Sequence, residues 1–128
     1  MDQITLFRSL FKGRDDVFAI RWGKENKSGY SPVYSYDPYY YKRHRMAGGT
    51  FQNYTDKSHL PLSDGEIIKH LDGQQHIGVY PLLTDNTSWF LAADFDETNW
   101  KSDALKFIDA CRKKGIPAYL ERSRSGDG

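Results

Sequence analysis

Two aspartates end an apolar segment of the chain, and their spacing suggests metal chemistry. Residues 91–96 read Leu-Ala-Ala-Asp-Phe-Asp, so Asp94 and Asp96 flank Phe95. Because side chains alternate between the faces of a strand, both carboxylates would lie on one face, about 7 Å apart. The two negatively charged carboxylates would repel each other and lose part of their hydration. A divalent cation such as Mg²⁺, held by one or two carboxylates plus substrate phosphates, would remove both difficulties.

A simpler interpretation of the same residues stays open at this point. Asp94 and Asp96 can be the polar end of a strand, with Asp96 close to the N-terminus of a following helix. Two aspartates separated by one residue are also common by chance.

The C-terminal residues 121–128 combine serine hydroxyls, glycines and arginines, which together suit a triphosphate. The candidate nucleotide-binding residues are Arg122, Arg124, Ser125, Gly126 and Gly128. A plain polar turn is the alternative. A strand leading into this turn beside the aspartate strand would place phosphate binding and metal binding at one edge of a sheet.

A third candidate site interleaves aromatic and basic residues over residues 39–45, Tyr-Tyr-Tyr-Lys-Arg-His-Arg. In proteins that bind single strands, bases stack on aromatic rings while cations contact phosphates. The candidate nucleic-acid-binding residues are Tyr41, Lys42, Arg43 and Arg45. The alternative is a solvated basic loop whose tyrosines rest on the sheet.

The composition indicates a globular protein without a global nucleic-acid signature. Hydrophobic residues make up 38% of the 128 residues and charged residues 27%, and the net charge is +1. Cys111 is the only cysteine, which excludes an internal disulfide and a multi-cysteine zinc site and fits a reducing cytosol. We find no signal peptide and no apolar run that could span a membrane, and therefore expect a cytoplasmic protein without a membrane partner.

The first half of the chain has few clear periodicities. Apolar residues at helical spacing over residues 4–11 predict an amphipathic helix, and residues 17–22 predict a strand. Residues 23–61 show no helical period apart from a possible short turn at residues 39–46. We therefore expect a long irregular stretch there, of the kind that is usually functional or disordered.

The second half is more regular. Ser63 and Glu66 have the spacing of a capping box and open a short helix. Apolar runs at residues 77–83 and 88–95, separated by residues 84–87, predict a β-hairpin with a four-residue loop.

A third helix and a last strand complete the predicted fold. Residues 99–114 carry an apolar stripe of helical period, and residues 118–122 predict a strand. A crossover helix between two strands makes them parallel neighbours. The predicted fold class is therefore α+β, with a β-hairpin plus a βαβ sheet and helices packed on it.

Several segments together resemble one family. The chain resembles the primase domain of bacterial TOTE conflict systems, which belongs to the archaeo-eukaryotic primase superfamily. The Asp-Phe-Asp and Arg-Ser-Arg-Ser-Gly-x-Gly motifs occur in the right order, and the similarity extends over nearly the whole chain. The matching segments are residues 6–18, 27–32, 60–64, 77–83, 89–96 and 121–128.

The resemblance implies a domain that makes or extends nucleic-acid strands from nucleoside triphosphates with Mg²⁺ or Mn²⁺. It implies that Asp94 and Asp96 bind the catalytic metal, and that Ser125, Gly126 and Gly128 contact the phosphates of the incoming nucleotide. The implied partners are a nucleoside triphosphate, a single-stranded or primed nucleic acid, and helicase and nuclease domains of the same larger defence protein.

The chain departs from the family pattern in two ways. Many relatives carry a cysteine-rich knuckle between the positions of Pro32 and Pro61, where this chain has no cysteine, so no zinc is expected. The family pattern also continues past Gly128, to a phosphate-binding histidine and a third acid. We therefore expect a single primase-like domain over residues 1–128, the first part of the primase fold, truncated at its C-terminal end and inactive by itself.

Within this domain, we assign residues 1–62 to an N-terminal helix, a strand and a Tyr/Lys/Arg-rich loop. Residues 63–128 would form a ββαβ core that carries both motifs.

Two rival functions remain open from the residues. Residues 94–98 end an apolar strand as the first motif of haloacid dehalogenase-like phosphohydrolases does, with Asp94 as the covalent nucleophile. That motif normally opens its sheet, whereas here a hairpin precedes it. The other rival is a non-catalytic nucleic-acid-binding module in which both carboxylates are structural.

Overall fold

The structure is a computed structural model of the chain, and it describes residues 1–124 and residue 126. The chain forms two compact units, Met1–Leu91 (unit 1) and Ala92–Gly128 (unit 2), each described by itself below. The prediction that residues 1–128 form one domain stays a prediction.

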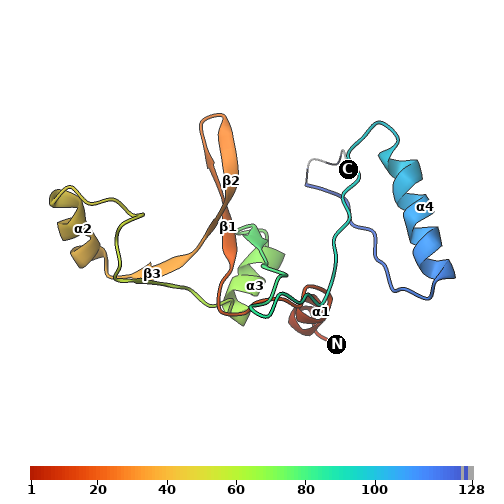
Figure 1. Ribbon diagram of the computed structural model, residues 1–128, viewed down its shortest axis with the longest axis horizontal. Coiled ribbons are helices and arrows are strands. Elements are labelled where there is room, and N and C mark those ends of the chain that lie inside the picture. Colours follow the sequence, from red (N-terminus) through yellow and green to blue (C-terminus); the bar gives the residue numbers. More distant parts are fainter. Residues whose placement is uncertain (125, 127–128) are drawn as a thin grey trace. The chain divides into compact units, whose positions relative to one another are not determined.

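The described residues form an α+β structure with antiparallel strands, which confirms the predicted fold class (Figure 1). One sheet has the strand order β2-β1-β5 and the other pairs β3 with β4. Unit 2 contains the helix α4 (Trp100–Lys113). The elements of unit 1 are α1 (Gln3–Leu10), β1 (Ala19–Lys24), β2 (Lys27–Pro32), β3 (Tyr34–Tyr36), α2 (Pro38–Met46), β4 (Lys57–His59), α3 (Asp64–Leu71) and β5 (Ile77–Gly78).

A small hydrophobic core joins α1, α3 and the three-stranded sheet of unit 1. Its buried members are Phe18, Leu62, Ile67 and Ile77, and Ile67 is fully buried. Side chains of α1 and of the β2–β3 link pack against this cluster. Arg8 of α1 also binds α3, because its guanidinium contacts the Asp64 carboxylate at 2.7 Å.

Beyond this core, β1 and β2 continue as a two-stranded ribbon. β5 pairs only with Ala19 and Ile20 of β1, whereas β2 pairs with all of β1 up to the Lys24–Lys27 pair at the turn. Figure 1 shows the two strands side by side over this length. The outer part of the ribbon is therefore largely exposed, as its side chains have no third strand beside them.

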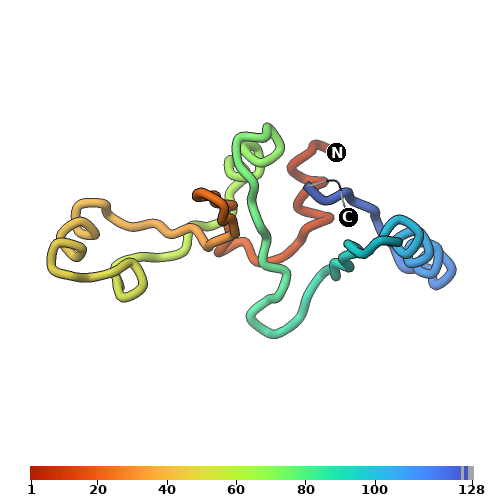
Figure 2. Tube along the Cα trace, turned by 90° about the horizontal axis from the view of Figure 1, so that it is seen from above, coloured from red at the N-terminus to blue at the C-terminus, as the bar shows by residue number. Residues whose placement is uncertain are grey.

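Residues 33–60 form what we call the tyrosine lobe, which contains β3, α2 and β4. In Figure 2 the chain runs out along β3, coils in α2 and returns along β4, which pairs with β3. The interior of the lobe is aromatic, with ring contacts among Tyr34, Tyr36, Tyr41, Phe51 and Tyr54.

Polar side chains hold the loop that closes this lobe. The Lys57 ammonium donates to the backbone carbonyls of Phe51 and Tyr54 and lies 4.9 Å from the Phe51 ring centroid. His44 Nε2 lies 2.8 Å from the side-chain oxygen of Asn53. Burial also raises the pKa of Tyr54, whose hydroxyl finds no hydrogen-bond partner among the described residues.

The prediction that residues 23–61 are irregular is wrong, because they contain β2, β3, α2 and β4. The possible short turn at residues 39–46 is the full helix α2. Its start is well defined, since the Asp37 side chain accepts a hydrogen bond from Tyr39 N at 2.8 Å and Pro38 occupies the first turn. Apolar periodicity did not predict this helix because α2 is polar almost throughout and has no apolar residues at helical spacing.

The predicted hairpin over residues 77–95 is also wrong beyond its turn. Leu83 N donates to Thr87 O at 2.9 Å, so the turn closes as expected. However, only Ile77–Gly78 is a strand, and residues 88–95 pair with no strand in the described part of the chain. Side chains compete with pairing here, because the Phe90 ring contacts Phe11 and the Trp89 ring lies under the Lys12 ammonium.

The predicted strand at residues 118–122, and with it the parallel βαβ pairing, is absent from the described part of the chain. A strand needs a neighbour to bind its backbone groups, and no described segment of unit 2 supplies one. The predicted helices at residues 4–11, after Ser63 and over residues 99–114 are confirmed as α1, α3 and α4.

The full burial of Ile67 in the core leads to a prediction about stability. Ile67→Ala should lower the free energy of unfolding by about 2 to 5 kcal/mol, because it leaves a cavity at a fully buried position. Ile68→Ala is the matched control, since Ile68 is 44% exposed, and it should cost less than about 1 kcal/mol. Urea denaturation of both variants measures the difference, and equal losses would contradict the position of the core.

Glu66 makes a prediction about pH. Hydrogen bonds from Lys69 (2.7 Å) and from Gln75 (2.6 Å) lower the pKa of its carboxyl group in the folded chain. The ionised form therefore stabilises the fold above the unfolded-state pKa, and this contribution is lost as the pH falls through the folded-state pKa. Glu66→Gln should lower stability by about 1 kcal/mol at pH 7.

The difference between Glu66→Gln and the unchanged chain should shrink below about pH 4. Thermal unfolding across this pH range tests it, with the exposed Glu121→Gln as control. A difference that is constant with pH would show that the carboxylate contributes no charge-dependent stability.

Candidate functional site

The two aspartates lie in unit 2, in the segment that precedes α4. Asp94 and Asp96 are exposed, whereas Phe95 between them is half-buried and its ring centroid lies 5.6 Å from that of Phe107 on α4. Phe95 is thus less exposed than either acid, but the segment forms no strand, so the strand alternation that was expected to place both carboxylates on one face is absent. Phe95 holds this segment against the helix and leaves both carboxylates in solvent.

Neither carboxylate has a structural role among the described residues. Asp94 and Asp96 form no hydrogen bond and no ion pair there. α4 begins at Trp100 with Asn99 at the N-cap position, so Asp96 does not cap the helix. The simpler interpretation, in which Asp96 serves the helix N-terminus, thus lacks a contact to support it, and both carboxylates are free to bind a cation.

The donor set restricts which metal would fit. Within the described part of the chain, no three or more His, Cys, Asp or Glu side chains are grouped so that they could hold a metal ion. A metal at Asp94 and Asp96 would therefore take further oxygens from substrate phosphates or water. Mg²⁺ is commonly bound in this way, by one or two carboxylates plus phosphates.

The C-terminal turn lies in the same unit and is described in part. Arg122 and Arg124 are exposed, and Gly126 N donates to Ser123 O at 2.9 Å. Gly126 has a φ of 82°, in the left-handed region that favours glycine. Ser125 and Gly128, which the sequence also assigns to nucleotide binding, lie outside the described residues.

The aromatic and basic candidates lie in unit 1, on α2. Lys42, Arg43 and Arg45 are exposed and form no ion pair with any described residue. Tyr41 instead belongs to the interior of the tyrosine lobe, because its ring contacts those of Tyr36, Phe51 and Tyr54. The structure thus gives Tyr41 a packing role.

The exposed rings of α2 are Tyr39 and Tyr40, which belong to the predicted aromatic and basic site of residues 39–45, although the prediction chose Tyr41 as the binding tyrosine. They are 63% and 55% exposed. A signal for them was present, since Asp37 followed by Pro38 marks a helix start. Because successive helix residues are rotated by about 100°, a helix beginning there predicts that the three tyrosines point in different directions.

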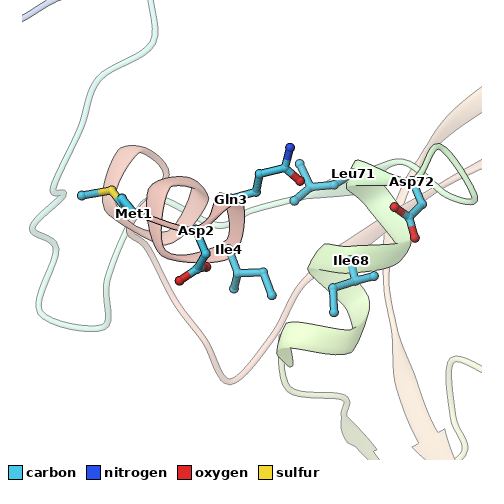
Figure 3. Close-up of a pocket in the computed structure, with 7 residues that line it drawn as sticks. All are labelled: Met1, Asp2, Gln3, Ile4, Ile68, Leu71 and Asp72. Atoms are coloured by element: carbon cyan, nitrogen blue, oxygen red, sulfur yellow. The ribbon is translucent and has the colours of Figure 1, made fainter.

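A shallow groove of about 510 Å³ lies between the start of α1 and the end of α3, and no candidate site residue lines it (Figure 3). Asp2 on its rim is already occupied as the N-cap of α1, where it accepts hydrogen bonds from Thr5 that lower its pKa. The groove is lined by Met1, Asp2, Gln3, Ile4, Ile68, Leu71 and Asp72.

None of the helices in the described residues combines the length and the apolar composition that crossing a membrane requires.

Comparisons with known proteins place the chain in one family. No curated protein and no solved structure matches it. The family model of the TOTE conflict system, Archaeo-Eukaryotic Primase domain matches residues 2–128, and thus both the aspartate pair and the C-terminal turn. The chain therefore belongs to the archaeo-eukaryotic primase domains of TOTE conflict systems, a family of primase-like nucleotidyltransferases.

Proposed function

We propose that this chain is part of a domain that transfers nucleotides from nucleoside triphosphates onto a nucleic-acid strand. The observation that carries the proposal is the pair Asp94 and Asp96. Both are exposed and without a partner among the described residues, in a chain that matches the primase family over residues 2–128. Free carboxylates at this spacing are suited to a catalytic metal rather than to the stability of unit 2.

In this proposal Asp94 and Asp96 hold Mg²⁺ or Mn²⁺ together with the triphosphate. Such a metal, when bound, lowers the pKa of an attacking 3′ hydroxyl and neutralises charge on the phosphates. Arg122 and Arg124 add positive charge beside the phosphates. The backbone of the turn at Gly126, with Ser125 and Gly128, contacts the phosphate oxygens through hydroxyl and amide donors.

The proposal also assigns partners. Lys42, Arg43 and Arg45 bind the phosphates of the nucleic-acid strand. The domain acts in the cytoplasm beside helicase and nuclease domains of a larger defence protein. Membership of the family supports nucleotide and nucleic-acid substrates. The roles of the α2 residues and of the neighbouring domains are further parts of the proposal.

Metal-dependent nucleotide binding tests the proposal. Calorimetry of the chain with MnCl₂ and a nucleoside triphosphate should show heat that disappears on addition of EDTA. Asp94→Ala combined with Asp96→Ala should abolish this metal-dependent heat, because the phosphates then lose the ion that links them to the chain. Asp109→Ala is the matched control, since Asp109 is an exposed carboxylate of α4 that pairs with Lys113 at 2.8 Å.

Four outcomes would contradict the proposal. Metal-dependent heat that survives the double substitution would refute the assignment of the aspartates, as would undiminished strand extension by a longer protein with the same changes. Trapping of an aspartyl-phosphate analogue with beryllofluoride would favour the phosphohydrolase. Absence of metal-dependent nucleotide heat would favour a non-catalytic binding module.

A further inference from the structure

We infer that α2 is a platform that selects single-stranded over double-stranded nucleic acid by stacking unpaired bases on Tyr39 and Tyr40. The inference rests on the proposed function for its partner, a nucleic-acid strand, and names the part of that strand that the lobe recognises. The observations that carry it are the exposure of two rings, the charge beside them and the rigid packing behind them.

The two sides of α2 have different roles. The inner side carries Tyr41 and His44, which are fixed by ring contacts to Tyr54 at 5.3 Å and 5.1 Å. The outer side carries Tyr39 and Tyr40, whose ring centroids lie 5.5 Å apart. Because the inner side is held in the lobe, the outer rings are presented on a fixed helix and lose little freedom when a base stacks on them.

The charge of α2 fits an anionic partner. Arg43 lies four residues after Tyr39 and three after Tyr40, so it is a neighbour of both residues on the helix surface. Lys42 and Arg45 add positive charge, and no acidic residue occurs within the helix. Basic residues also favour a helix C-terminus through its dipole, but this does not account for two exposed tyrosines in the first turn.

The combination of rings and cations favours a single strand over other anions. A nucleobase offers a flat face to each tyrosine while its phosphate contacts an arginine, and stacking contributes about 1 to 3 kcal/mol per base. In a duplex both faces of each internal base are covered by neighbouring base pairs. A duplex can therefore contact the cations of this surface through its phosphates, but its internal bases cannot stack on the two rings.

Fluorescence anisotropy of the full chain tests the inference, in EDTA and low salt and without nucleotide. The probes are a labelled thymidine strand of about 15 nucleotides and a duplex of equal length. The chain should bind the single strand more tightly. Tyr39→Ala combined with Tyr40→Ala should weaken single-strand binding at least about 10-fold and leave duplex binding within about 3-fold, because stacking is lost and phosphate contacts remain.

Three control variants locate the effect. Tyr39→Phe with Tyr40→Phe keeps the rings and should bind as the unchanged chain does. Tyr30→Ala removes a tyrosine that is 53% exposed on β2, outside the lobe, and should leave binding unchanged. Arg43→Gln should reduce the slope of log affinity against log salt by about 0.7, the value for one phosphate contact of a single strand.

The outcomes separate this inference from the proposed function. The variant with Asp94→Ala and Asp96→Ala should bind the strand as the unchanged chain does. If it loses the metal-dependent nucleotide heat but keeps strand binding, the result bears on the assignment of the aspartates and not on α2. Equal affinity for strand and duplex, no binding of the strand, or no effect of the double tyrosine substitution would overturn the platform. Tighter binding to phosphatidylserine vesicles, weakened by the same substitution, would also overturn it and indicate a membrane surface.

Discussion

The backbone hydrogen bonds of Val33 link the core of unit 1 to the tyrosine lobe. Val33 N donates to Phe18 O at 3.0 Å and Leu60 N donates to Val33 O at 2.9 Å. Phe18 is buried in the core, while Val33 and Leu60 are the two ends of the tyrosine lobe. One residue thus joins the core to both ends of the lobe, and its side chain packs against the same core. The orientation of α2 depends on this link, because β3 and β4 connect α2 to Val33 and Leu60.

Unit 2 is built differently, with very little buried surface. Ala104 is its only residue that is buried among those described, and Phe95 is held by its contact with Phe107. Few contacts therefore position the aspartates. This is compatible with a site that takes part of its ligands from the substrate, since the phosphates and the ion would then contribute to fixing the carboxylates. A site of several protein ligands would require more support from neighbouring side chains.

The sequence predicts those parts of the fold that depend on local chemistry. Ser63 accepts a hydrogen bond from Glu66 N, as the capping pattern indicates, although Glu66 itself binds Lys69 and Gln75. Strands are harder to predict because each depends on a distant partner. Residues 88–91 have the composition of a strand, yet Trp89 and Phe90 contact residues that follow α1, and nothing local to the apolar run indicates this.

The candidate sites also divide into residues that local chemistry identifies and residues whose roles depend on distant contacts. The motif around Asp94 and Asp96 was visible because it is a short run of chemically distinct residues. The roles of Tyr39, Tyr40 and Tyr41 were not, because three adjacent tyrosines look equivalent until a helix assigns them to different sides. Packing with Phe51 and Tyr54 then distinguishes Tyr41 from the other two.

With a net charge of +1, the proposed selectivity for single strands would have to come from a local surface of this chain. A strongly basic protein binds strand and duplex alike through phosphates, since charge attraction carries no information on base pairing. On the proposed platform the cations of α2 are few and lie near exposed rings, so stacked bases would contribute a large share of the binding energy. An enzyme that copies a template must bind bases that are not yet paired. Aromatic faces recognise that state directly, because a base cannot stack on them while it remains within a duplex.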